Sequence, residues 1–61
     1  MITVKAEVIG EETTFDLDSS FIPRKNDVLI IQEKRYKTQE VIMEYAHNNY
    51  LLSITLLLDK I

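Results

Sequence analysis

The sequence predicts an all-β fold built from five short strands. Apolar and polar residues alternate through most of the chain, which is the pattern of strands that bury one face and expose the other. The alternating segments follow one another closely and are separated by polar turns. Short, regularly spaced strands of this kind are typical of a small, closed or nearly closed antiparallel barrel.

Each strand is placed by its own run of alternating residues. We expect the strands over residues 2–9, 13–17, 28–31, 35–47 and 50–58. Within them, the side chains expected to face the core are Ile2, Val4, Ala6, Val8, Phe15, Leu17, Val28, Ile30, Val41, Met43, Tyr45, Leu52, Ile54, Leu56 and Leu58.

Polar segments separate these strands. The turn at residues 10–12 contains Gly10, the only glycine, which accepts a positive φ without steric strain. Residues 18–20 end the second strand, and Pro23 predicts an extended connector across one end of the barrel. In the turn that follows, Asn26 is the residue expected in the left-handed conformation. Two further turns are expected, over residues 32–34 and 47–49.

The stretch from residue 35 to residue 47 fits two patterns. Four of its apolar residues lie at helical spacing, namely Val41, Ile42, Tyr45 and Ala46. No proline or glycine marks the end of such a helix, however. Two strand segments whose alternation shifts near residues 39–40 fit as well, and a β-bulge produces a shift of this kind. We expect a bulged strand, with the helix as the alternative.

One segment resembles a known class of fold. Residues 21–30 (FIPRKNDVLI) and residues 36–41 (YKTQEV) combine a proline, a basic turn ending in Asn-Asp, alternating apolar residues and a tyrosine that opens a longer strand. This pattern is similar to that of small SH3-like β-barrels, including short proteins of bacteria and their phages. The resemblance implies a five-stranded antiparallel SH3-like barrel, encoded by a phage or mobile element. Such sequences commonly have glycine where this chain has Asn26.

Length and composition limit the functions that this chain can perform. Its 61 residues form one domain, which buries only about 60% of the surface of the unfolded chain. There is no cysteine, so neither disulfides nor a Cys-ligated zinc ion can stabilise the fold. The net charge of −3 disfavours general nucleic-acid binding. No secretion signal is recognisable, and the longest apolar run is shorter than the roughly 20 residues that span a membrane, so we expect a cytoplasmic protein without a membrane partner.

An apolar surface is the first candidate for a functional site. Five apolar residues alternate out of phase with the expected core, and they are Leu29, Ile31, Ile42, Leu51 and Leu57. Clustered on adjacent strands, they would form the kind of patch that marks a homo-oligomeric or partner-protein interface. Two alternatives stay open: the barrel closes unevenly and buries some of them, or the strand register differs by one residue.

A basic cluster is the second candidate. Five of the seven basic residues fall within one short stretch, at Arg24, Lys25, Lys34, Arg35 and Lys37. Together with one or more tyrosines they would bind nucleic acid or another anionic partner. The alternative is a pair of solvated turns balanced by Asp27 and Glu33.

The sequence contains no recognisable catalytic or metal-binding motif. His47 is the only histidine, and no neighbouring residue supplies a nucleophile for it. The carboxylates Asp16, Asp18 and Asp27 lack the spacing of a calcium-binding loop. We therefore expect a non-catalytic interaction module with no catalytic residues, no cofactor and no metal. The alternative is a nucleic-acid-binding barrel.

Overall fold

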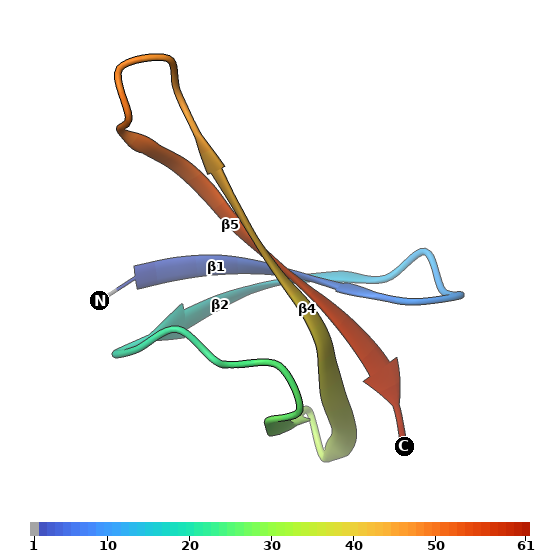
Figure 1. Cartoon of the computed structure of the whole chain (residues 1–61). Coiled ribbons are helices and arrows are strands. Elements are labelled where there is room, and N and C mark those ends of the chain that lie inside the picture. The colour runs from blue at the N-terminus through green and yellow to red at the C-terminus, as the bar shows by residue number, and fades with distance from the viewer. Residues whose placement is uncertain (1) are drawn as a thin grey trace.

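The protein forms a single curled sheet (Figure 1). The structure is a computed structural model that describes residues 2–61 and all of their side chains except those of Ile2 and Ser19, so the inward position expected for Ile2 lies outside the described side chains. These residues contain no helix, and therefore none that could cross a membrane. The five strands are β1 (Ile2–Val8), β2 (Thr14–Ser19), β3 (Val28–Ile31), β4 (Lys34–Tyr45) and β5 (Leu51–Lys60).

The sheet is mixed, with the strand order β2-β1-β5-β4-β3. Three pairs are antiparallel, whereas β1 and β5 run parallel. The expected all-β class and the five strands are confirmed, but the expectation of a purely antiparallel sheet is wrong. Short hairpins force antiparallel pairing only between consecutive strands. The β1–β2 hairpin is joined to the β3–β4–β5 meander by a longer connector, which leaves the relative direction of the two units free.

The two ends of the sheet curl towards each other across the core. β2 and β4 are separated by two strands, and at a spacing of about 4.8 Å they would lie about 14 Å apart in a flat sheet. The rings of Phe15 on β2 and Tyr36 on β4 are nevertheless only 6.1 Å apart between their centroids. The sheet therefore forms a half-barrel whose concave face encloses the core.

The core fills this concave face. Its fully buried apolar residues are Val4, Ala6, Val8, Tyr36, Ile54, Leu56 and Leu58. Further apolar residues pack against them and are partly buried, namely Phe15, Leu17, Ile22, Leu29, Ile31 and Val41. The expected alternation of β1, of β2 and of the inner part of β5 is confirmed for the described side chains. Each fully buried leucine contributes about 1.5–3 kcal/mol to stability.

A β-bulge shapes β4, as the sequence predicts. Thr38 lies opposite Leu58 and Glu40 lies opposite Leu57, so Gln39 between them has no partner on β5. Without the extra residue, the side chain of Val41 would point away from the core. The bulge reverses the alternation, so Val41 faces the core. Residues 34–45 therefore form one long strand, and the helical alternative is wrong.

In β3 the expected side-chain orientation is wrong by one residue. Leu29 and Ile31 pack against the core, whereas Val28 and Ile30 are exposed. All four residues of this strand are apolar, so the sequence has no alternation from which its orientation could be read. The orientation is set by the turn at residues 32–33, where both residues have positive φ (51° and 68°). A two-residue turn of this kind fixes the register of the strands that it joins.

The far ends of β4 and β5 also differ from expectation. Met43, Tyr45 and Leu52 were expected in the core and are exposed. β3 pairs with β4 only over Lys34–Lys37, and β1 pairs with β5 only over Thr55–Leu58, so neither strand covers the far half of this hairpin. A second register shift near the turn also leaves Leu52 without a partner on β4.

The connector between β2 and β3 packs onto the sheet. Pro23 is buried and Ile22 contacts the core. The following turn is held by the amide of Arg24, which donates a hydrogen bond of 2.9 Å to the Asp27 carboxylate. Asn26 has the left-handed conformation expected for it, with φ of 78°.

Thr38 places a polar atom in the core without a partner. Its side chain is fully buried, and among the described residues its Oγ1 atom has no hydrogen-bond partner. A buried hydroxyl without a partner costs about 1–3 kcal/mol.

Thr38→Val is therefore expected to stabilise the fold by about 1 kcal/mol. This increase corresponds to a rise in Tm of roughly 4–8 °C in a domain of this size. Thermal unfolding followed by circular dichroism measures the difference, with Thr14→Val on the exposed side of β2 as the control, expected within about 0.5 kcal/mol of wild type. A lower Tm for Thr38→Val would show that this hydroxyl has a partner in the folded protein.

Candidate interaction surface

The far half of the β4–β5 hairpin projects beyond the rest of the sheet (Figure 1). We call residues 40–54 the outer hairpin. Within the described chain, Glu40–Tyr45 of β4 pairs with β5 alone, and Leu51–Ile54 of β5 pairs with β4 alone. The outer hairpin is therefore a two-stranded ribbon with two free edges. An isolated ribbon of this kind is at best marginally stable in water.

A hydrogen-bonded turn closes the outer hairpin. The amide of Ala46 donates to the carbonyl of Tyr50 at 2.8 Å, and the amide of Asn49 donates to the carbonyl of Ala46 at 2.9 Å. Asn49 has a positive φ of 67°, which asparagine tolerates better than most residues. Below the turn, the Ser53 hydroxyl donates to the Glu44 carboxylate at 3.3 Å. The turn expected at residues 47–49 is confirmed.

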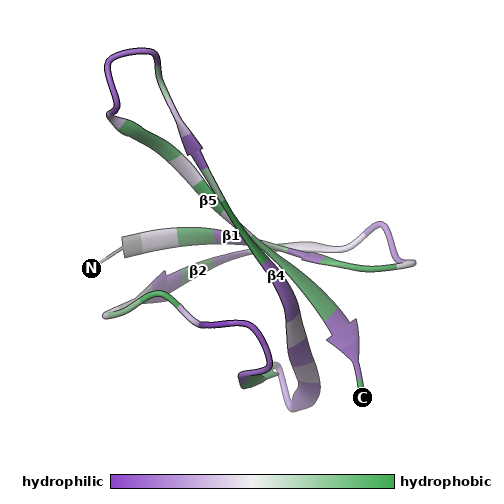
Figure 2. Ribbon diagram, viewed as in Figure 1, coloured by the Kyte–Doolittle hydropathy of each residue, from purple (hydrophilic) through white to green (hydrophobic). Residues whose placement is uncertain are grey.

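Large apolar side chains are exposed along this ribbon. They are Ile42, Met43, Tyr45, Tyr50, Leu51 and Leu52. Met43 lies opposite the buried Ile54 and Tyr45 lies opposite Leu51, so this row continues the concave core face beyond the point where other strands cover it. Figure 2 shows apolar stretches below the polar turn. Exposed apolar residues gathered on one element mark an interaction site.

The molecule exposes more surface than a compact monomer of its size. A compact monomer of 7.1 kDa has an accessible surface of about 4,100 Å². This chain exposes 4733 Å². The excess of roughly 600 Å² approaches the ~800 Å² that each partner buries in a standard interface. The radius of gyration, 11.7 Å, likewise exceeds the value of about 10.5 Å expected for a compact domain of this length.

The five residues expected to form an apolar patch lie in three places. Leu29 and Ile31 face the core from β3. Ile42 and Leu57 are diagonal neighbours on the convex face of β4 and β5, because Ile42 lies opposite Thr55 and Leu57 lies opposite Glu40. Leu51 lies on the outer hairpin, opposite Tyr45. Tyr45, Tyr50 and Leu52 are also exposed, although in sequence they continue the alternation of the core and so carry no sign of exposure.

The basic residues lie on the connector turn and at the start of β4. The turn containing Arg24 and Lys25 is held against β4, because the amide of Asn26 donates to the carbonyl of Thr38 at 2.8 Å. Lys34 and Arg35 are consecutive in β4 and therefore point to opposite faces of the sheet.

Acidic residues are interspersed among these basic residues. Asp27 caps the connector turn. Asp59 lies opposite Lys37 and also accepts a hydrogen bond of 3.3 Å from Gln39. Tyr36 is only 3% exposed, so it has no free face on which a base could stack.

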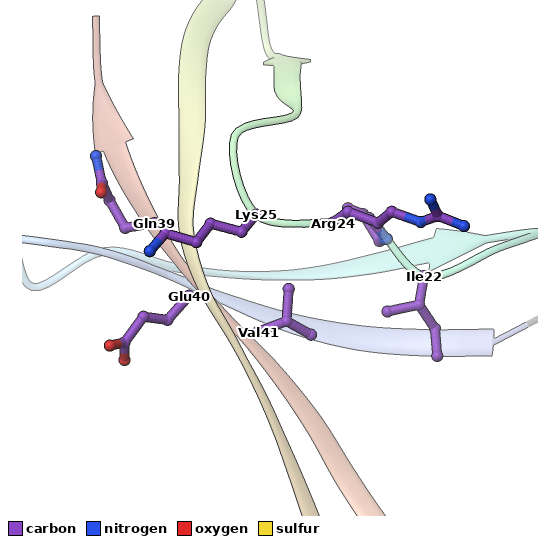
Figure 3. A pocket seen from close by; sticks show the side chains of 7 residues that line it. Ile22, Arg24, Lys25, Gln39, Glu40 and Val41 are labelled. Atoms are coloured by element: carbon purple, nitrogen blue, oxygen red, sulfur yellow. The ribbon is translucent and has the colours of Figure 1, made fainter.

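A hollow of about 620 Å³ lies between the connector and the bulge of β4 (Figure 3). Its lining residues are Ile22, Pro23, Arg24, Lys25, Gln39, Glu40 and Val41. In Figure 3, the side chains of Arg24 and Lys25 extend in opposite directions, and the Glu40 side chain lies on the Lys25 side of the view, away from Arg24. These charged groups do not converge on a common point. The hollow therefore lacks the convergent polar groups that orient a small ligand.

Residues with catalytic or metal-binding potential are dispersed. His47 is exposed in the hairpin turn. Within residues 2–61, no group of three or more histidine, aspartate or glutamate side chains is placed to hold a metal ion.

No protein-family model, curated protein or solved structure matches this chain.

Proposed function

We propose that this chain is a small, non-catalytic, cytoplasmic interaction module that self-associates through its outer hairpin. The observation that supports the proposal most strongly is the ribbon itself, which has two free edges and six exposed apolar side chains. Covering these side chains removes apolar surface from water, and pairing either edge satisfies backbone groups that the chain leaves without a strand partner.

A second copy of the chain is the proposed occupant of this surface. The fold exposes roughly 600 Å² more accessible surface than a compact monomer of this mass. This area is close to the accessible surface, about 800 Å², that each subunit buries in a standard stable interface. A domain of 61 residues also gains more from additional burial than a larger one does, because it buries a smaller fraction of its surface on folding.

The proposed interface differs in part from the one expected from sequence. Ile42 and Leu51 remain in it, and Leu57 lies at its base on the convex face. Leu29 and Ile31 do not belong to it, because both pack against the core. Their place is taken by four residues of the outer hairpin, namely Met43, Tyr45, Tyr50 and Leu52.

We also propose that the half-barrel is a variant of the SH3-like fold, as its resemblance to phage and bacterial proteins implies. Five strands around one core and a proline-containing connector before β3 support this relationship. The parallel β1–β5 pair departs from the antiparallel barrel that the resemblance implies. Nucleic-acid binding remains the alternative function, but Asp27 and Asp59 lie among the basic residues and offset their charge.

The molar mass in solution tests the proposed function. We expect light scattering coupled to size exclusion to give a species larger than the 7.1 kDa monomer. An association driven by apolar burial should persist at high salt, whereas one driven by Arg24, Lys25 and Arg35 should weaken as salt screens their charges. Dissociation at high salt would contradict the apolar interface.

A further inference from the structure

A second apolar surface lies at the open seam of the half-barrel. We call the groove between the edge strands β2 and β3 the seam, and its volume is about 410 Å³. It is lined by Val4, Leu17, Asp18, Pro23, Val28, Leu29, Ile30, Ile31 and Leu56. All of these residues except Asp18 are apolar, so the seam has the character of a site for an apolar chain segment.

Both sides of the seam present unpaired strand edges. β2 and β3 are the terminal strands of the sheet, so each has one side without a strand partner within residues 2–61. An edge of this kind accepts a further strand through backbone hydrogen bonds, and the groove beside it then selects the side chains of the added strand. A strand lying in the seam would extend the half-barrel towards a closed barrel.

We propose that the seam of one copy receives the outer hairpin of a second copy. This inference rests on the proposed function and specifies its geometry. The outer hairpin has two free edges and apolar side chains, and the seam has two free edges and an apolar floor. Each surface can pair the free strand edges of the other and cover its apolar side chains. The two surfaces lie on different parts of the same chain.

The charges on the two surfaces support the same arrangement. On the β5 side of the outer hairpin, residues 50–54 contain no charged side chain, whereas the β4 side contains Glu40 and Glu44. Along the seam, β2 contains Asp16 and Asp18, whereas β3 is flanked by the basic start of β4 at residues 34–37. We therefore infer that the β5 side of the hairpin lies towards β2 and the β4 side towards β3, because the reverse orientation places like charges side by side.

This arrangement makes the contact heterologous. The hairpin of each copy would occupy the seam of the next, and its own seam would remain available to a third copy. Contacts of this type generate rings when the rotation between copies closes, and open chains when it does not. A two-fold dimer in which hairpin contacts hairpin is the competing arrangement.

Two exposed substitutions separate these arrangements. Leu52→Glu alters the hairpin and leaves the seam intact, whereas Ile30→Glu alters the seam and leaves the hairpin intact. The side chain of Leu52 is 63% exposed and that of Ile30 is 72% exposed, so neither substitution removes a core residue. Val28→Glu is a second seam variant, and unchanged circular dichroism verifies that each variant is folded.

We expect each variant alone to associate at least about 30-fold more weakly than wild type, because each places a charge in the contact. An equimolar mixture of Leu52→Glu and Ile30→Glu should form a one-to-one dimer and nothing larger, since only one intact hairpin and one intact seam can meet. If both seam variants associate as wild type does, or if the mixture remains monomeric while wild type associates, the inference is overturned and the proposed function stands. If wild type itself is monomeric, the proposed function fails as well.

Discussion

Leu56→Ala is expected to remove about half of the protein's free energy of unfolding or more. Leu56 is fully buried at the centre of the sheet, opposite Val41 on β4 and beside Ala6 on β1. Replacing a leucine in such a position by alanine typically costs about 3–5 kcal/mol, because a cavity remains. At about 0.05–0.15 kcal/mol per residue, a domain of this length has a total stability of only about 3–9 kcal/mol.

Urea unfolding followed by circular dichroism measures this loss. Ile61→Ala is the control, because it removes a similar side chain from an exposed position at the C-terminal end. We expect the control to change the free energy of unfolding by no more than about 0.5 kcal/mol. A loss below about 1 kcal/mol for Leu56→Ala would mean that Leu56 does not lie in a close-packed core.

Leu52→Glu is expected to convert the associated protein to a folded monomer. Leu52 is exposed on the outer hairpin, so the substitution leaves the core intact. In the associated state the same position is covered, and a glutamate there must either lose its hydration or separate the two copies. A charge that is buried in a contact without a partner costs about 2–5 kcal/mol of binding free energy. This cost corresponds to an association at least about 30-fold weaker.

Ile61→Glu is the matched control for this substitution. Ile61 is 60% exposed, close to the 63% of Leu52, but it lies at the end of the chain beyond β5. Light scattering at one protein concentration should show the Leu52→Glu variant at 7.1 kDa and the Ile61→Glu variant at the mass of wild type. Equal loss of association in both variants would show that added negative charge, rather than the outer hairpin, governs the behaviour.

Much of the fold follows from alternation in the sequence. Val4, Ala6 and Val8 are separated by polar residues, so their common direction can be read directly, and the structure buries all three. The shift of alternation near residue 39 likewise predicts the bulge that the structure contains. These features were predictable because each one rests on a contrast between neighbouring side chains.

The features that were not predictable lack this contrast. β3 reads Val-Leu-Ile-Ile, so its orientation depends on the geometry of the turn at residues 32–33 rather than on its own residues. The parallel β1–β5 pair depends on the path of the connector, which local patterns do not encode. Met43 and Tyr45 follow the alternation of the core, but their exposure depends on where β1 and β3 stop pairing with the long hairpin.

The candidate interface was predictable only in outline. Five apolar residues out of phase with the expected core predict an interaction surface, and two of them, Ile42 and Leu51, lie on the outer hairpin. Its position along the chain required the pairing of the strands, because a leucine on a covered strand and a leucine on a projecting ribbon look alike in sequence.

The molar mass of the unsubstituted chain across a range of concentrations tests the central claim most directly. Self-association through the outer hairpin predicts a mass above 7.1 kDa. The mass should reach a fixed multiple of the monomer if the copies form a closed assembly, and should keep rising with concentration if they form open chains. A mass that stays at 7.1 kDa at the highest concentration would contradict the account, because the exposed ribbon would then be stable in water without a second copy.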